Sequence, residues 1–348
     1  MSKRVKIGNI YIGNGEKIAI QSMTTTRLAN LSASINAAKE LEQAGCDIIR
    51  FSVATELDAL NIKELKKQVK APIVADIHFD YRLAIKSIIS GADKVRINPG
   101  NLGGENNLKE VAQVLKDYKI PVRVGANTGS IDKEFLSKYG KSSTALVESA
   151  LKRVHCLEKY GVEDIVISVK ASSVPLMVQS YREIAKKCNY PLHIGVTEAG
   201  TFFNGVVKNS IGIGSLLLDG IGDTIRVSLS SNPVEEVKAA KSILKAVNKY
   251  NLGAEVVACP TCGRCEWDCM NFANDVEEYL KDVEMPLKVA VMGCAVNGPG
   301  EAMDSDLGIA GQGEYCFIFK KGEIIKKVLK ENAKAEFFGE IDKCLIQK

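Results

Sequence analysis

Four cysteines lie close together in the last third of the chain, at Cys259, Cys262, Cys265 and Cys269. Their spacing, C-x2-C-x2-C-x3-C, is typical of the thiolate ligands of bacterial ferredoxins, although Met270 stands where that run has proline. Taken alone, the run predicts a four-iron four-sulfur cluster on the first three cysteines, with Cys269 serving a second cluster. The chain contains no second run that would complete such a cluster.

Two other kinds of metal site agree less well with this spacing. A zinc ribbon needs a second C-x2-C pair elsewhere, and the chain has none outside this run. The C-x3-C-x2-C pattern of radical S-adenosylmethionine enzymes is also absent. Five further cysteines are expected to be ordinary core or surface residues, namely Cys46, Cys156, Cys188, Cys316 and Cys344.

A tenth cysteine, Cys294, ends the β-branched run 288–294 and precedes the loop 295–301, Ala-Val-Asn-Gly-Pro-Gly-Glu. Glycine and proline favour a tight turn there, and Glu301 places a carboxylate seven residues after the thiol. The loop is therefore predicted to carry metal ligands. Because a carboxylate leaves iron more easily than a thiolate does, Glu301 would leave one iron able to bind a substrate oxygen as a Lewis acid.

Polar side chains recur where short β-branched runs end in the first part of the chain. In a parallel barrel these ends form the open face where substrates bind. The set consists of Arg50, Asp76, His78, Arg96, Asn98, Arg123, Asn127, Lys170, Thr197, Glu198, Arg226 and Ser228. Any single arginine could form a structural salt bridge instead. The recurrence of four arginines and a lysine at successive strand ends nevertheless predicts a ligand with several negative charges, such as a phosphate ester.

Glu198 is the acid in this set that is best suited to proton transfer. Burial would raise its pKa and neighbouring cations would lower it, and the sequence does not decide between the two effects. His78 is a candidate phosphate donor or acid. No role is predicted for His155 and His193, which we place on a helix and early in a strand.

Eight β-branched runs alternate with amphipathic stretches, which predicts a (βα)8 TIM barrel. The runs span residues 17–24, 47–53, 72–78, 94–100, 121–127, 164–170, 191–198 and 223–230. A doubly wound open sheet is the main alternative, and Gly-Ile-Gly at 212–214 is a weak signal for it. After residue 250 the pattern changes, so we expect a substrate-binding barrel over 1–250 and a smaller α+β cluster domain over 251–348.

The composition excludes several classes of protein. The 348 residues carry a formal net charge of +4, with 46% hydrophobic and 25% charged residues, as in an ordinary globular protein. So small a charge does not indicate a nucleic-acid partner. No apolar run approaches the roughly 20 residues that span a membrane, and no secretory signal is recognised. We therefore expect a cytoplasmic protein with neither a nucleic-acid nor a membrane partner.

Five segments, taken in order, make the chain resemble a known family over essentially its whole length. They are ADIHFD at 75–80, VRINPGN at 95–101, GVTEAG at 195–200, ACPTCGR at 258–264 and VMGCAVNGPGE at 291–301. The chain is similar to members of the 4-hydroxy-3-methylbut-2-enyl diphosphate synthase family. These proteins are iron–sulfur enzymes of the methylerythritol phosphate route to isoprenoids. The resemblance is to the two-domain bacterial form of the family.

The resemblance implies one 4Fe-4S cluster, held by Cys259, Cys262, Cys294 and Glu301 in place of the ligand set that the spacing suggests. It also implies that Glu198 is the catalytic acid, with Glu301 as a second catalytic group. The implied substrate contacts are the other strand-end residues above, Thr197 among them, together with Asn297. Family members are similar homodimers in which the cluster domain of one subunit closes over the barrel of the other.

The implied reaction converts 2-C-methyl-D-erythritol 2,4-cyclodiphosphate into 4-hydroxy-3-methylbut-2-enyl diphosphate, with flavodoxin or ferredoxin as electron donor. Two alternatives remain open. One is an iron–sulfur electron carrier with a barrel docking domain, and the other is a barrel enzyme resembling the pterin-condensing synthases, with structural zinc in the cysteine loop.

Overall fold

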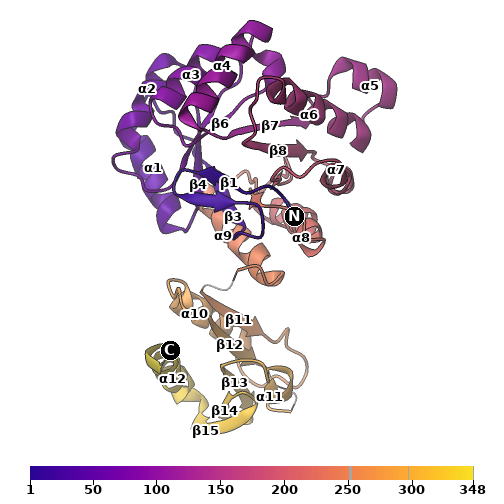
Figure 1. Cartoon of the computed structure of the whole chain (residues 1–348). Helices are drawn as coiled ribbons and strands as arrows, with labels where there is room; N and C mark the ends of the chain where they lie inside the picture. Colours follow the sequence, from indigo (N-terminus) through magenta and orange to yellow (C-terminus); the bar gives the residue numbers. More distant parts are fainter. Residues whose placement is uncertain (251–252, 297, 348) are drawn as a thin grey trace. The chain divides into compact units, whose positions relative to one another are not determined.

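The structure is a computed structural model that describes residues 1–250, 253–296 and 298–347. The chain forms two compact units, Met1–Tyr250 and Asn251–Lys348 (Figure 1). Each unit has its own hydrophobic core and is described separately below.

The first unit is built on a parallel sheet of eight strands, and each of the eight predicted runs contains one of them. The strands are β3 (Ala19–Met23), β4 (Ile48–Ser52), β5 (Ile73–Asp76), β6 (Lys94–Arg96), β7 (Val122–Asn127), β8 (Ile165–Lys170), β9 (His193–Ile194) and β10 (Thr224–Ile225). They pair in the order β8-β7-β6-β5-β4-β3-β10-β9, and a parallel bridge between Ile167 and Leu192 joins the two ends. The TIM-barrel prediction is therefore confirmed.

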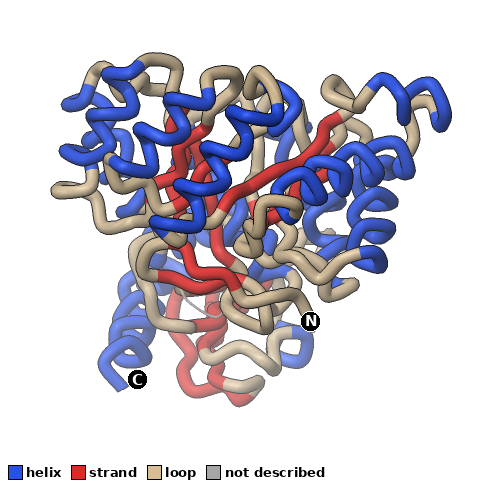
Figure 2. The backbone as a smooth tube through the Cα atoms, turned by 45° about the horizontal axis from the view of Figure 1, so that its top comes forward, coloured by secondary structure: helices blue, strands red, loops and turns tan. Residues whose placement is uncertain are grey.

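Helices surround these strands on the outside (Figure 2). They are α1 (Leu31–Gln43), α2 (Glu56–Leu65), α3 (Tyr81–Ile89), α4 (Glu105–Tyr118), α5 (Lys133–Tyr139), α6 (Ser143–Glu158), α7 (Val174–Lys187), α8 (Phe202–Leu218) and α9 (Pro233–Ala246), with a short 3-10 helix, η1 (Pro99–Asn101). The Gly-Ile-Gly at 212–214 lies inside α8 and not at a strand-to-helix turn. The signal for an open dinucleotide-binding sheet was therefore misleading.

An amino-terminal hairpin, β1 (Val5–Ile7) and β2 (Ile10–Ile12), covers the end of the barrel where the strands begin. Val5, Ile7 and Ile12 are buried in one cluster with the first residues of β3 and β4, Ala19 and Ile48. This hairpin is not predicted from the sequence, because two strands of three residues are too short to show a period. Since one end of the barrel is closed by apolar packing, the carboxyl ends of the strands are left to form a site.

The second unit is an α+β domain with a five-stranded sheet in the order β11-β12-β13-β14-β15. Its elements are β11 (Ala254–Ala258), α10 (Cys269–Leu280), β12 (Leu287–Met292), α11 (Gly298–Glu301), β13 (Leu307–Gln312), β14 (Tyr315–Lys320), β15 (Glu323–Leu329), η2 (Lys330–Asn332) and α12 (Ala333–Gln347). β11, β12 and β13 are parallel, and Ala258 pairs with Val291 at the carboxyl ends of β11 and β12. The loops that follow these two strands therefore leave the sheet at the same edge.

No helix in the described ranges is both long enough and apolar enough to cross a bilayer.

Candidate functional site

A cavity of about 160 Å³ opens at the carboxyl ends of the barrel strands. We call it the mouth cavity. It is lined by Arg50, Asp76, His78, Arg96, Gly125, Ala126, Arg123, Asn127, Ser168, Lys170, Thr197, Arg226 and Ser228. Ten of the predicted strand-end residues are thus brought together, because the carboxyl ends of parallel strands meet on one face of a barrel.

Two predicted residues lie outside this lining, and a third is not described. The side chain of Asn98 accepts a hydrogen bond from the backbone N–H of Gly100 (3.3 Å) and caps η1. Glu198 is exposed, with a left-handed φ of +52°. Asn297 lies outside the described residues.

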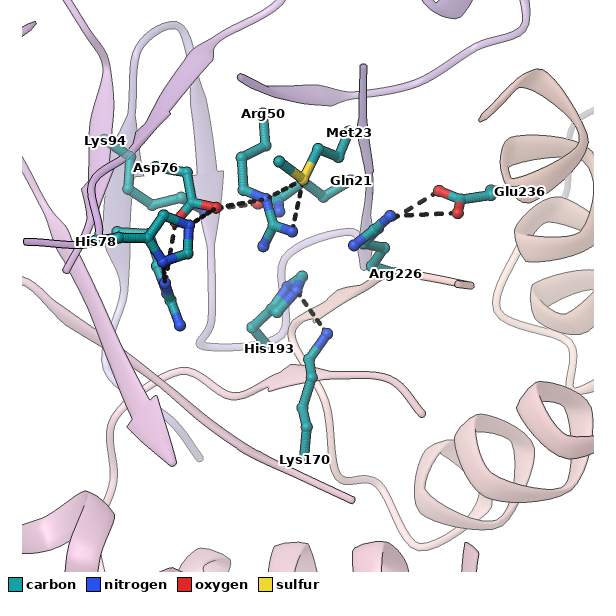
Figure 3. Close-up of polar contacts among 11 residues, drawn as sticks. Gln21, Met23, Arg50, Asp76, His78, Lys94, Lys170, His193, Arg226 and Glu236 are labelled. Carbon is teal, nitrogen blue, oxygen red and sulfur yellow. Dashed lines mark hydrogen bonds and ion pairs between the residues drawn. The ribbon is translucent and has the colours of Figure 1, made fainter. Parts of the chain in front are cut away.

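Asp76 is the carboxylate around which one half of the mouth cavity is organised (Figure 3). Its Oδ1 accepts a hydrogen bond from Arg96 Nη1 at 3.2 Å, and its Oδ2 lies 3.7 Å from Arg50 Nε and 3.5 Å from His78 Nε2. Burial alone would raise the pKa of Asp76, but the hydrogen bond with His78 and the charges of the arginines outweigh burial and hold the pKa far below its usual range. Asp76 is therefore a carboxylate at any working pH.

Arg50 is held from a second side by a sulfur atom. Its Nε and Nη2 lie 3.1 Å and 2.8 Å from the thioether sulfur of Met23, which is a weak acceptor. Burial lowers the pKa of Arg50 to about 10, while Asp76 opposes that shift and neighbouring Arg226 and Arg96 add to it. The guanidinium stays charged at neutral pH, but its surroundings do not fully compensate its charge.

Glu236, in the first turn of α9, organises the other half of the mouth cavity. Its carboxylate accepts hydrogen bonds from Arg226 (3.3 and 3.4 Å), from Ser22 Oγ (2.9 Å) and from the backbone N–H of Leu229 (3.0 Å). Glu236 is not predicted as a site residue from the sequence, because a glutamate in the first turn of a helix is ordinarily an exposed residue that interacts with the helix dipole. Here the side chain is only 4% exposed.

Replacing Glu236 by leucine is expected to destabilise the barrel by about 3–5 kcal/mol, because it leaves the half-buried Arg226 guanidinium without its counter-ion. Urea unfolding measures this loss. The matched control is the neighbouring Glu235, which pairs with the exposed Lys238, so that Glu235→Leu should change stability by less than about 1 kcal/mol. Equal losses for the two variants would contradict the role assigned to Glu236.

Five cationic side chains line the mouth cavity, and two carboxylates of the described residues, Asp76 and Glu236, form ion pairs with them. Arg123 is 3% exposed, and its Nε and Nη1 have no hydrogen-bond partner within the described part of the chain. Burial lowers the pKa of Arg123 well below its usual value, and the charges of Arg50 and Arg96 lower it further. Such an excess of unsatisfied donors is suited to an anion that carries several charges.

The predicted metal ligands of the second unit lie on loops at the carboxyl edge of its parallel strands. Cys259 follows β11 and donates its backbone N–H to Val291 of β12 (2.9 Å). Gly293 lies between the two loops: a Cβ there would come within 3.1 Å of Cys265 Sγ and 3.5 Å of Cys259 Sγ. Glycine at this position therefore lets the thiols of one loop approach the backbone of the other.

Arg264 lies among the remaining predicted ligands. A hydrogen bond with Cys294 raises the pKa of the Arg264 guanidinium, and Cys262 and then Glu301 raise it further by their charges. No role is predicted for Arg264 from the sequence, although the residue lies within the ACPTCGR segment at 258–264.

Cys265 and Cys269 complete the ferredoxin-like spacing; Cys269 faces the interior of the second unit, whereas Cys265 is half-buried. Cys269 is the first residue of α10 and is buried; burial raises its pKa to about 12, with nearby Cys265 and Cys259 adding to the shift. Its Sγ lies 3.7 Å from the carbonyl oxygen of Val291. A buried thiol of this kind is a poor thiolate ligand. The geometry thus favours a structural role for Cys269 over the second-cluster role that the spacing suggests.

Within residues 253–296 and 298–347, as in the described barrel, no three Cys, His, Asp or Glu side chains gather closely enough to hold a single metal ion. An iron–sulfur cluster distributes its ligands over separate irons, so its donors need not converge on one point. Three thiols and a carboxylate on loops that leave one edge of a sheet fit such a group by their chemistry and by their placement.

Fold and site together define a class of two-part protein, in which a (βα)8 barrel with a polyanion cavity is joined to an α+β domain that carries cysteines. Family comparisons agree with this description: residues 2–241 match the GcpE TIM-barrel domain, and residues 255–343 match the GcpE protein C-terminal domain. The chain belongs to the GcpE family. Members of this family are iron–sulfur oxidoreductases of isoprenoid biosynthesis.

Curated relatives match the chain over nearly its full length. One from Caldanaerobacter subterraneus subsp. tengcongensis is 52% identical over 346 residues, covering 99% of this chain and 98% of the relative. One from Clostridium acetobutylicum is 52% identical over 342 residues, with 98% of both chains covered. Both are named 4-hydroxy-3-methylbut-2-en-1-yl diphosphate synthase (flavodoxin).

Among solved structures, the dihydropteroate synthases of Yersinia pestis and Vibrio fischeri ES114 are similar to the barrel. Each has a TM-score of 0.52 and covers 71% of this chain and 99% of its own, at 12% and 13% identity. Identity this low supports a common barrel fold and does not support a common reaction.

Proposed function

We propose that the chain is a 4-hydroxy-3-methylbut-2-enyl diphosphate synthase of the non-mevalonate route to isoprenoids. It converts 2-C-methyl-D-erythritol 2,4-cyclodiphosphate, two electrons and two protons into (E)-4-hydroxy-3-methylbut-2-enyl diphosphate and water. The observation that carries the proposal is the mouth cavity, whose excess of cations matches a cyclic diphosphate in charge. Relatives at 52% identity carry the name of this activity.

In the proposed complex the barrel binds and orients the diphosphate. Arg123 offers donors from a buried position and Lys170 from a half-buried one, while Asp76 and Glu236 hold Arg50, Arg96 and Arg226 in place. Further hydrogen-bonding groups line the cavity, from the side chains of His78, Asn127, Thr197 and Ser228. Because these donors are already fixed before the substrate arrives, little reorganisation is needed when charge develops at the opening ring.

The cluster ligands and the proton donor are also part of the proposal. When bound to Cys259, Cys262, Cys294 and Glu301, one 4Fe-4S cluster supplies the two electrons singly. Glu198, which is exposed on the barrel, donates a proton to the oxygen that leaves as water, and Asn297 contacts the substrate from the cluster domain. A reducing compartment suits these thiol ligands, and we place the enzyme in the cytoplasm.

We further propose flavodoxin or ferredoxin as the electron donor, and a homodimer whose active site is shared between subunits. An apolar stripe on α8 supports the dimer: Phe203 and Leu218 are each 75% exposed and Ile211 is 56% exposed. These residues and Val207 recur at helical spacing on one side of α8. An exposed apolar surface of this kind is typical of an interface between proteins.

Replacing Ile211 by aspartate is expected to convert the dimer into a monomer, because each copy of a two-fold interface would then bury a charge. Light scattering coupled to size exclusion measures the mass. Leu60→Asp is the matched control, since Leu60 is 51% exposed on α2, outside the stripe. An unchanged mass for the Ile211 variant, or the same shift in both variants, would refute the stripe as the dimer surface.

An anaerobic assay of the reconstituted protein tests the proposed function directly. Protein, cyclodiphosphate and a reduced viologen are combined, the product is followed by mass spectrometry, and iron, sulfide and zinc are counted. Turnover with iron and sulfide present supports the synthase. An intact cluster without turnover favours the electron carrier, and zinc without iron favours the pterin-condensing type of barrel enzyme.

A further inference from the structure

A buried histidine lies directly behind the mouth cavity. His193, on β9, is fully buried, and its Nε2 lies 3.3 Å from Nζ of Lys170 at the end of β8 (Figure 3). Lys170 forms no ion pair with any described carboxylate, and His193 is the hydrogen-bond partner of its ammonium group. The interior layer of a barrel is ordinarily filled by branched apolar side chains, so a histidine at this position needs an explanation.

The ring of His193 is held from its other side as well. Its Nδ1 lies 2.8 Å from Oγ1 of Thr224, a fully buried residue on the neighbouring strand β10. Its backbone carbonyl accepts a hydrogen bond from the hydroxyl of Tyr181 (2.6 Å), and that hydroxyl accepts one from the backbone N–H of Val169 (3.2 Å). Tyr181 thus ties the strand segment of His193 to the residue next to Lys170.

The chemistry of the two groups determines which nitrogen of His193 carries the proton. Burial lowers the pKa of Lys170 well below its usual value, and the charges of Arg123 and Arg226 lower it further. While Lys170 is an ammonium it can only donate, so Nε2 must then offer a lone pair. The proton is then on Nδ1, which donates to Thr224 Oγ1. A protonated imidazolium has no lone pair and could not accept from Lys170.

The groups that surround His193 favour the neutral ring. Burial lowers its pKa well below the usual range, and four cations lower it further, namely Lys170 on β8, Arg123 on β7, Lys94 on β6 and Arg50 on β4. The other groups in contact with the ring and its backbone, Thr224 on β10 and Tyr181 on α7, are uncharged at neutral pH.

We propose that His193 is a positioning residue, which as a neutral Nδ1–H tautomer fixed by Thr224 accepts a hydrogen bond from Lys170 and holds its ammonium group at the mouth cavity. The functional part of this inference rests on the proposed function, in which Lys170 binds the diphosphate. Without a neutral acceptor, the Lys170 ammonium would be repelled by Arg123, Arg226 and Arg50, with Glu236 opposing them, and would turn away from the position at which an anion needs it.

The tautomer can be tested without any assay of activity. The chain has three histidines, so protein labelled with 15N-histidine should give three resolvable ring systems, and His155→Gln and His78→Gln assign two of them. We expect His193 to be neutral and protonated on Nδ1 from about pH 5 to pH 9. An Nε2–H ring, or a ring that titrates within this range, would overturn the proposal.

Kinetics of the holoenzyme test the coupling to Lys170. His193→Phe should raise KM for the cyclodiphosphate about 10- to 100-fold with a smaller change in kcat. His193→Gln, whose side-chain oxygen can accept in the place of Nε2, should recover part of this loss. In a Lys170→Met background, His193→Phe should add little, whereas full additivity would overturn the coupling.

A control and a second readout separate the possible failures. His155→Phe, on the exposed face of α6, should leave KM and kcat unchanged. If His193→Phe does not fold, as judged by thermal melting, the coupling is tested with His193→Gln alone and in the Lys170→Met background, where it should again add little to KM. A further outcome is that Lys170→Met itself leaves KM unchanged while the tautomer of His193 is as expected. In that case Lys170 is not a substrate contact, and the positioning role of His193 fails even though the enzyme still turns over.

Discussion

Replacing Cys294 by alanine is expected to abolish the iron–sulfur cluster, so that iron and sulfide fall from about four per chain to near zero. Cys294 lies on the loop after β12, and its side chain approaches Arg264 among the other proposed ligands. Loss of one thiolate opens the cluster to solvent, and a cluster with two remaining thiolates should not survive reconstitution. Iron and sulfide analysis, with the visible absorption of the reconstituted protein, measures the effect.

Cys265→Ser and Cys269→Ser are the matched controls, and both should retain the cluster. The Cys265 thiol lies 3.2 Å from the carbonyl oxygen of Trp267, and Cys269 is buried in the core. The serine hydroxyl in each variant can donate to the carbonyl oxygen that the replaced thiol contacts, that of Trp267 for Cys265 and that of Val291 for Cys269. The expected loss of stability is therefore only about 1 kcal/mol. The reverse pattern, with the cluster lost in Cys265→Ser and kept in Cys294→Ala, would establish the ligand set that the cysteine spacing alone suggests.

Arg123→Met is expected to weaken substrate binding and to stabilise the empty barrel. The guanidinium is buried beside other cations, with two nitrogens unpartnered in the described structure, and its desolvation is not repaid until an anion binds. Replacing such a group by an apolar side chain of similar volume should raise the free energy of unfolding by about 1–4 kcal/mol. The lost charge-assisted hydrogen bonds should reduce affinity for the cyclodiphosphate by about 10- to 150-fold.

Urea unfolding of the ligand-free protein and calorimetric titration with the cyclodiphosphate measure these two opposite effects. Arg82→Met is the matched control, because Arg82 is an exposed arginine on α3 that pairs with Asp80, and neither stability nor affinity should change appreciably. A destabilised Arg123 variant, or one that binds substrate as tightly as the parent, would show that Arg123 is a structural residue.

The barrel and most of its mouth could be predicted from local signals. Each β-branched run contains a strand, and polar residues such as Arg50, Arg96 and Lys170 stand at the ends of these runs. Parallel pairing then brings all the ends to one face, so the position of a residue along its own strand is enough to place it at the site. The cationic character of the cavity follows from these positions without knowledge of any contact.

Other features depend on partners that are distant in the sequence. Glu236 meets Ser22 across 214 residues, and the terminal hairpin seals the barrel through strands that come later in the chain. His193 is an unremarkable residue early in a strand until barrel closure places Lys170 and Thr224 on its two sides. Glu198 lies outside the cavity lining, and its exposure and left-handed backbone become known only from the folded chain.

The sequence by itself determined the barrel, the strand-end cations and the cysteine-bearing loops, because periodicity, residue type and spacing are local properties of the chain. Only the tertiary structure decided which carboxylates hold which arginines, which thiol faces the core, and which neutral group faces the half-buried Lys170. These contacts depend on burial and on distances between strands and loops, and such quantities are defined only in the folded chain.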